Sequence, residues 1–141
     1  FLIKPIIIFP DKSIINLLKQ MGIENNSYVY KSSCNFIKET VKVEHAKNLN
    51  CYGYILNLFG KVIYYSGDSK TLSNKVLVDF IEGKIDYIYH DMTRFNNTIH
   101  ANVLYLAKII PKSLRKDVYA MHLDDLKTEL LARLLRFNIA K

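Results

Sequence analysis

The sequence predicts an α/β protein in which helices cover a β-sheet, and three observations support this prediction. Short runs rich in β-branched and aromatic residues, typical of buried strands, alternate with segments whose apolar residues recur at helical spacing. The chain has 141 residues, of which 50% are hydrophobic, so it can bury one sizeable core. No internal repeat, low-complexity tract or linker interrupts the alternation.

The chain begins with a predicted strand at residues 4–9, which ends at Pro10. A helix is expected to follow, capped by Asp11 and ended by Gly22, because glycine readily adopts the left-handed conformation found after a helix C-terminus. The apolar side chains expected on its buried face are Ile14, Leu17, Leu18 and Met21. Residues 24–33 are rich in turn-forming residues and carry no predicted element.

Two extended segments come next, at residues 36–43 and 51–59. The second is expected to turn at Gly60 and form a hairpin with a strand at residues 62–65. Apolar residues at helical spacing then predict a helix that ends at Gly83. These residues are Leu72, Val76, Leu77, Phe80 and Ile81.

The last third of the chain continues the alternation. Buried strands are predicted at residues 85–89 and 117–121, with a helix at residues 103–110 between them. Asp124 and Asp125 are expected to start a final helix, where their negative charge suits the helix dipole. The side chains expected on its inner face are Leu126, Leu130, Leu131, Leu134 and Leu135.

The composition indicates a soluble, cytoplasmic protein. The net charge of +7 comes from 20 basic and 13 acidic residues spread along the chain, which permits a polyanionic partner without requiring one. No apolar run is long enough to cross a membrane, and no signal peptide is recognisable, so we expect no membrane partner. Cys34 and Cys51 lack the paired spacing of a disulfide framework or a zinc motif.

Polar residues follow three of the predicted strands. Asp68, the pair His90 and Asp91, and His122 each come just after a strand, where α/β proteins gather their sites. A carboxylate and imidazoles at one sheet edge could bind zinc or another divalent ion, which would lower the pKa of a bound water. Taken singly, each residue also has a structural interpretation, since Gly-Asp-Ser is common in turns and helix caps and most histidines satisfy local hydrogen bonds.

Several short motifs, in order, resemble the second half of a metallo-β-lactamase-fold hydrolase, and most closely its ribonuclease Z-type phosphodiesterase branch. The motifs are Tyr65-Ser66-Gly67-Asp68-Ser69, Tyr89-His90-Asp91-Met92-Thr93, Ile99-His100-Ala101 and Tyr119-Ala120-Met121-His122. Two earlier segments, Val43-Glu44-His45 and Cys51-Tyr52-Gly53-Tyr54, resemble that branch as well. The resemblance implies the C-terminal half of an αββα sandwich.

The resemblance also implies roles for individual residues. Asp68 matches the family's aspartate that bridges two metal ions, and His122 matches its final metal-binding histidine. The implied metal is divalent, with zinc the first expectation and manganese or iron the alternatives. The loop that begins with His90 and Asp91 resembles the family's His-Glu-Ala-Thr loop, which makes both residues catalytic candidates. His100 resembles the histidine that protonates the leaving oxygen, and Asp91 would orient it.

A further recurring histidine of the family is matched by His45, which is expected near the site.

The chain departs from the family in two ways. Asp91 stands where ribonuclease Z-type enzymes have Glu, a shorter arm that could weaken the proton relay. The family's His-x-His-x-Asp-His motif, which supplies most of the metal ligands together with the histidine after it, does not occur in this sequence.

The family would place that missing half before Phe1, and a first residue other than Met agrees with this. We therefore expect residues 1–141 to form a single incomplete domain with an incomplete set of metal ligands. Without the partner sheet of the sandwich, apolar strands would be exposed. That face would bind the missing half, a complementary chain, or a second copy in a homodimer.

Three hypotheses about function follow. The first is the C-terminal part of a metal-dependent hydrolase, in which metal-activated water attacks a phosphodiester or a related ester, such as a lactone or thioester; the chain alone is expected to be inactive. The second is a non-catalytic nucleic-acid-binding or assembly module that retains the fold. The third is a structural domain in which Asp68 caps a helix.

Overall fold

The computed structural model describes residues 6–8, 11–12, 14–31, 33–47, 50–96 and 99–140, and of Ile6 only the backbone. The chain divides into two compact units, Phe1–Asn35 and Phe36–Lys141, and each is considered by itself. Within the described ranges, no helix combines the length and the apolar character needed to cross a membrane.

The first unit contains a short parallel strand pair and a helix. Its elements are β1 (Ile6–Ile8), α1 (Ile14–Gln20), the 3₁₀ helix η1 (Asn25–Ser27) and β2 (Tyr28–Tyr30). The predicted strand at residues 4–9 is confirmed over Ile6–Ile8, and its remaining residues lie outside the described ranges. The strand β2 was not predicted, because its three residues are too short for a period to be recognised.

The helix α1 forms as predicted, and Gly22 has the expected positive φ of 75°. The prediction of a buried apolar face is wrong, because α1 has no buried residue. Ile14, Leu17 and Met21 are all exposed. A seven-residue helix and a two-stranded pair are too small to enclose a core within this unit.

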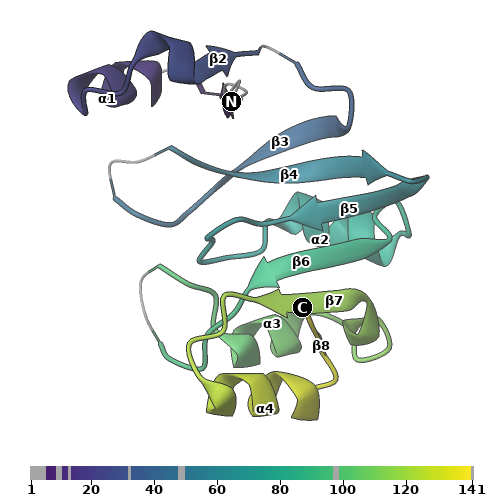
Figure 1. Ribbon diagram of the computed structural model, residues 1–141. Coiled ribbons are helices and arrows are strands. Elements are labelled where there is room, and N and C mark those ends of the chain that lie inside the picture. Colours follow the sequence, from purple (N-terminus) through teal and green to yellow (C-terminus); the bar gives the residue numbers. More distant parts are fainter. Residues whose placement is uncertain are drawn as a thin grey trace. The chain divides into compact units, whose positions relative to one another are not determined.

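The second unit is built on a six-stranded sheet whose strands lie side by side in chain order (Figure 1). The strands are β3 (Ile37–Val43), β4 (Cys51–Leu58), β5 (Lys61–Tyr65), β6 (Tyr87–Asp91), β7 (Val118–Met121) and β8 (Asn138–Ile139). The first three are antiparallel, and β5 to β8 run parallel. The predicted hairpin is confirmed, with Phe59 and Gly60 both at positive φ, as a two-residue turn of this kind requires.

In the described part of this unit, three α-helices and one 3₁₀ helix accompany the sheet: α2 (Asn74–Ile81), α3 (Val103–Ile109), η2 (Arg115–Asp117) and α4 (Leu126–Leu134).

The three α-helices hold the core against the sheet. Each is capped by the side chain of the residue before it, Ser73, Asn102 and Asp125 respectively, which accepts a backbone N–H of the first turn. Figure 1 shows α2 and α3 on the far side of the sheet. The core lies between these helices and the strands, and includes Tyr64, Val76, Phe80, Ile88, Leu106 and Val118.

The predicted inner face of α4 is partly wrong. Leu126, Leu130 and Leu134 are 68%, 52% and 81% exposed, whereas Leu131 and Leu135 do pack against the core. The buried positions on α4 are Thr128 and Ala132, which share a helix face with Leu131 and Leu135. Leucines occur on both sides of this helix, so their spacing alone did not determine which side faces the sheet.

The side of the sheet opposite α2 and α3 carries a row of tyrosines. Strand register aligns Tyr54, Tyr65, Tyr89 and Tyr119 across four neighbouring strands. The rings of Tyr89 and Tyr119 stack with centroids 4.6 Å apart. Figure 1 shows no helix of this unit in front of β5 and β6. We refer to these four tyrosines as the tyrosine row.

Candidate functional site

Three metal-type ligands meet where β5, β6 and β7 end. These strands are parallel, so their carboxyl ends lie at the same edge of the sheet. Asp68 follows β5, Asp91 is the last residue of β6, and His122 follows β7 directly. One ligand atom from each residue lies within 4.8 Å of the others, as the sequence predicted for the ends of successive strands.

Left-handed backbone conformations direct two of these side chains. Gly67, just before Asp68, has φ of 57°, and a Cβ there would lie 3.3 Å from the Tyr52 carbonyl oxygen. His122 itself has φ of 50°, a left-handed conformation that residues with a side chain adopt at some energetic cost. Its Nδ1 lies 2.7 Å from Oδ1 of Asp68, and both side chains are about half exposed, at 47% and 46%.

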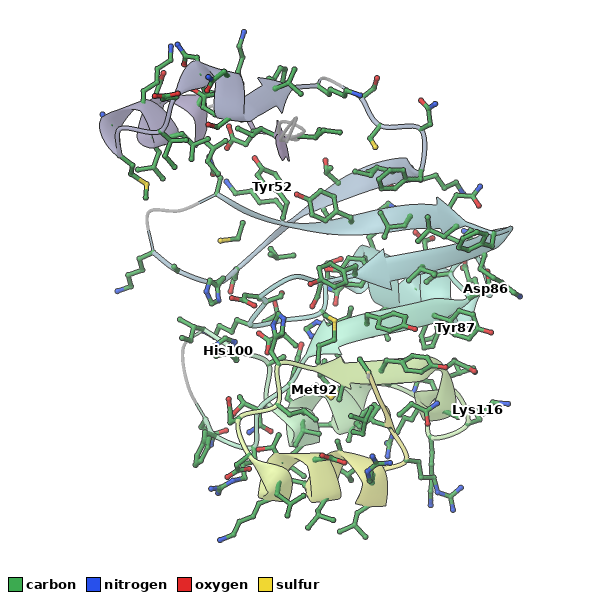
Figure 2. The ribbon with its side chains drawn as sticks, viewed as in Figure 1. Tyr52, Asp86, Tyr87, Met92, His100 and Lys116 are labelled. Carbon is green, nitrogen blue, oxygen red and sulfur yellow. The ribbon has the colours of Figure 1, made fainter. Side chains whose placement is uncertain are left out.

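Asp91 is buried and held by hydrogen bonds. Its side chain is 1% exposed, and Oδ2 lies 2.5 Å from Nδ1 of His100. The same oxygen accepts the backbone N–H of Ser69 at 3.2 Å, and the backbone N–H of Asp91 donates to Oγ of Ser66 at 3.1 Å. The segment that contains Ser66 and Ser69 thus holds Asp91 from one side, and His100 binds its carboxylate from the other. Figure 2 shows His100 at this edge of the sheet.

The surroundings of the pair raise the pKa of His100. Partial burial lowers the pKa of His100, but the hydrogen bond and charge of Asp91, with the charges of Asp68 and Asp124, outweigh it and raise this pKa above the ordinary 6.5. Burial raises the pKa of Asp91, and the hydrogen bond from His100 opposes that shift. A carboxylate beside an imidazole is the arrangement expected of a general acid.

His45 also lies in this cluster. Its Nδ1 is 2.9 Å from the Ile99 carbonyl oxygen, and because a carbonyl only accepts, that nitrogen is the donor. Its Nε2 lies 3.7 Å from Oδ2 of Asp68, and its ring centroid is 5.3 Å from that of His100. The structure thus places His45 near the site, beside Asp68 and His100.

His90 is placed differently from the other candidates. Its side chain is fully buried, with Nδ1 2.8 Å from the Asp91 carbonyl oxygen and the ring centroid 6.4 Å from that of Tyr64. Burial lowers its pKa and keeps the ring neutral. This environment suits a structural histidine, and a catalytic role for His90 stays a prediction.

Sequence reasoning did not identify the residues that support the site. Ser66 and Ser69 bind Asp91 through a hydroxyl and a backbone N–H. Thr93 donates a hydrogen bond from its hydroxyl to Asp124, which ties the segment after β6 to the segment before α4. Serine and threonine beside acidic residues are too common to single out, so only the three-dimensional arrangement reveals these contacts.

The donor set of this cluster fits a divalent cation. Carboxylate oxygens and an imidazole nitrogen are ligands that zinc, manganese and iron accept. Among the described residues, Oδ1 of Asp91 is buried without a hydrogen-bond partner, and such an atom costs free energy unless it gains one. Asp68 and His122 are therefore the residues that would hold a metal, and Oδ1 of Asp91 is a third candidate ligand atom beside them.

Comparisons with known proteins agree with this fold. The metallo-β-lactamase fold protein YhfI from Bacillus subtilis superposes with a TM-score of 0.60 at 14% sequence identity, over 99% of this chain and 62% of that one. The chain thus spans less than two thirds of that structure's length. The α/β prediction and the metallo-β-lactamase-type fold are confirmed.

No curated protein matches the sequence. The ribonuclease Z-type branch stays a prediction, because the family that matches is a different one. That family is described as Anti-Pycsar protein Apyc1, and the match runs from residue 12 to residue 138. The chain therefore belongs to the Anti-Pycsar protein Apyc1 family.

Proposed function

We propose that this chain forms part of a metal-dependent hydrolase that acts on a phosphodiester or a related ester through metal-activated water. The observation that carries the proposal is the pair formed by His100 and Asp91, whose side-chain atoms lie 2.5 Å apart beside Asp68 and His122. A proton donor next to a group of metal-type ligands is what hydrolysis of an ester with a poor leaving group requires. We also propose that this activity serves the anti-Pycsar role for which the family is named.

Each residue has a distinct part in this proposal. Asp68 and His122 bind a divalent metal, which, when bound, supplies Lewis acidity and a nucleophile at neutral pH. His100 donates a proton to the oxygen of the departing group. Asp91 orients the imidazole of His100 and favours its charged form, as the raised pKa of His100 indicates. Ser66 and Ser69 hold Asp91 in position.

A phosphodiester is the preferred substrate class for two reasons. The segment from His90 to Thr93 and His100 resemble the corresponding motifs of ribonuclease Z-type phosphodiesterases, although Asp91 replaces their glutamate. The net charge of +7 favours a polyanionic substrate.

We further propose that the remaining metal ligands come from another polypeptide segment. The resemblance makes Asp68 a bridge between two metal ions, and a catalytic zinc ion uses three protein ligands, so two ions need more ligands than Asp68, His122 and Oδ1 of Asp91 provide. The tyrosine row is the surface that supports this proposal, because strands with aromatic side chains are normally covered by a second layer. The covering layer would be a complementary segment or a second copy of the chain.

Metal content and turnover test the proposal together. We expect stoichiometric zinc, manganese or iron, measured by plasma mass spectrometry, in the protein joined to its complementary segment. The Asp68→Ala, His122→Ala double variant should lose it. His100→Gln should keep the metal but lose most turnover of bis(p-nitrophenyl) phosphate. Stoichiometric metal without turnover of any phosphodiester or ester tested would contradict the proposal.

A non-catalytic nucleic-acid-binding module is the second candidate, and the tyrosine row is the observation that favours it. Aromatic side chains on a sheet stack with bases, and a basic protein attracts the phosphate backbone. Salt-sensitive binding of single-stranded RNA that is undiminished in the Asp68→Ala, His122→Ala variant, but lost in Tyr89→Ala, would favour this candidate over the hydrolase.

A further inference from the structure

His90 lies beside the proposed machinery without taking part in its chemistry. Its side chain is fully buried near the end of β6, so the ring does not reach a substrate that binds at the surface. Nδ1 of His90 lies 2.8 Å from the carbonyl oxygen of Asp91, the next residue in the chain. Because a carbonyl oxygen only accepts, that nitrogen is the donor. His90 is thus bound to the backbone of the residue whose carboxylate binds His100.

The regular pairing of β5 with β6 stops before it reaches Asp91. The N–H of Ser66 still donates to the carbonyl oxygen of Tyr89, at 2.9 Å. If this parallel ladder continued, the N–H of Asp91 would donate to the Ser66 carbonyl oxygen, and the Asp91 carbonyl oxygen would accept the N–H of Asp68. Gly67, at a φ of 57°, turns the chain away from that path. Both backbone groups of Asp91 therefore need other partners.

Side chains supply these partners. The N–H of Asp91 donates to Oγ of Ser66 at 3.1 Å, and the Asp91 carbonyl oxygen accepts Nδ1–H of His90. The Ser66 hydroxyl in turn donates to the carbonyl oxygen of Gly67 at 2.6 Å, directly before Asp68. Ser66 and His90 therefore take the place of a paired strand at the point where the chain leaves the sheet toward Asp68.

The peptide unit that follows Asp91 is held on two sides. Its N–H, which belongs to Met92, donates to the Met121 carbonyl oxygen of β7 at 3.1 Å. Its carbonyl oxygen lies on the opposite side of the unit and binds His90. Without the second bond the unit would be held by β7 alone and could tilt. A tilt would move the Asp91 carboxylate, whose Oδ2 lies 2.5 Å from Nδ1 of His100.

We propose that His90 is a positioning residue, which holds the backbone of Asp91 through Nδ1–H and so keeps the Asp91 carboxylate in place against His100. The catalytic consequence rests on the proposed hydrolase function, whereas the positioning is a property of the chain that can be measured without turnover. This role would replace the direct catalytic role that the sequence predicted for His90.

Two substitutions separate the hydrogen bond from the packing of the ring. Asn carries its amide nitrogen on Cγ, where Nδ1 stands in histidine, so His90→Asn should keep the bond to Asp91. Gln carries its amide one atom further out, so His90→Gln should lose that bond. Gln is, however, closer to histidine in volume and leaves the smaller cavity. A role in packing alone therefore favours Gln, whereas the proposed role favours Asn.

The first readout is nuclear magnetic resonance of the metal-free full chain. In the wild type, long-range proton–nitrogen correlation should show a proton on Nδ1 of His90, assigned through its connection to the His90 backbone. The amide proton of Met92 should exchange with solvent on the order of 10-fold faster in His90→Gln than in His90→Asn, as the loss of one hydrogen bond implies. The amide proton of Ser66, which is bound within the regular ladder, is the internal control and should exchange alike in both variants.

The second readout is kinetic and uses the protein joined to its complementary segment. His90→Gln should lower kcat on the order of 10- to 100-fold with little change in KM, because misplacing a catalytic group by about 1 Å has effects of this size. His90→Asn should recover most of that loss. In a His100→Gln background the two His90 variants should have nearly equal kcat, since the residue that Asp91 positions is then absent. Metal content should be equal in all these variants.

Several outcomes would overturn the proposal. These are a proton on Nε2 of His90 with none on Nδ1, equal amide exchange of Met92 in the two variants, and a kcat as high in His90→Gln as in His90→Asn. A difference in kcat that follows a loss of metal, or that persists in the His100→Gln background, would also overturn it, because His90 would then act through another group. If the wild type shows no turnover, the hydrolase function fails, and the resonance measurements still decide whether His90 holds Asp91.

Discussion

Replacing Asp91 by Asn tests the central pair of the site with little change in shape. The substitution removes a buried charge and leaves an amide oxygen that can still accept the N–H of Ser69. The bond to Nδ1 of His100, 2.5 Å long in the wild type, changes from a charge-assisted bond to a neutral one. We expect the variant to fold and to lose the coupling of His100 to a carboxylate.

The expected effect depends on pH in a defined direction. The pKa of His100 is raised above 6.5 and that of Asp91 above 3.8, so the folded pair binds more protons than the unfolded chain between these values and somewhat above 6.5. Its contribution to stability is therefore present at acidic pH and is lost as the pH rises through the folded pKa values. Each extra proton bound by the folded state changes the free energy of unfolding by at most about 1.4 kcal/mol per pH unit.

The assay is urea denaturation of the metal-free wild type and Asp91→Asn at intervals from pH 5 to pH 9. The difference in unfolding free energy should favour the wild type most at pH 5 and should shrink toward pH 9. The other histidines are common to both proteins, so their own titration largely cancels in the difference. A difference that is constant with pH, or that grows toward pH 9, would refute the proposal that Asp91 raises the pKa of His100.

Two further predictions concern stability away from the proton pair. Gly53→Ala should lower the free energy of unfolding by about 1–3 kcal/mol, because the added Cβ would lie 2.6 Å from Oη of Tyr64. Tyr64→Phe removes that oxygen, so the double variant should lose less than the sum of the single ones in thermal denaturation; strict additivity would contradict this. Asp125, whose pKa the hydrogen bonds from Arg94 and Thr128 lower to about 2, should stabilise the fold above pH 3.8 and lose this effect as the pH falls toward 2. Urea denaturation of Asp125→Asn should therefore differ from the wild type at pH 6 and converge with it near pH 2.

The sequence predicted most of the second unit because its elements have long and regular patterns. The helices α2 and α3 and the strands β3 to β7 all appear within about two residues of their expected bounds. The strand β8 was missed, since Asn138 and Ile139 are too few to show a period and form a strand only by pairing with Tyr119 and Ala120 of β7. Strand formation there depends on a neighbour that the local sequence does not reveal.

Some contacts of the site could likewise be predicted from the sequence, and others could not. The convergence of Asp68, Asp91 and His122 follows from one rule, that ligands gather at the carboxyl ends of parallel strands, and that rule needs only the strand ends. The contact between His45 and Ile99 follows from no local rule, because it joins residues 54 positions apart through a loop backbone. Resemblance to a family pointed to His45, but only the structure shows which of its atoms makes a contact.

The two halves of the site differ in how complete they are within this chain. The half proposed to donate a proton is supported within the chain, since buried Asp91 is held by Ser66 and Ser69 and in turn holds the partly exposed His100. The half proposed to bind a metal is open, since Asp68 and His122 are about half exposed. A segment of the proposed kind, which supplies further ligands, would approach from the solvent side of these two residues. It would complete the metal site without disturbing the proton pair, which is already formed in its absence.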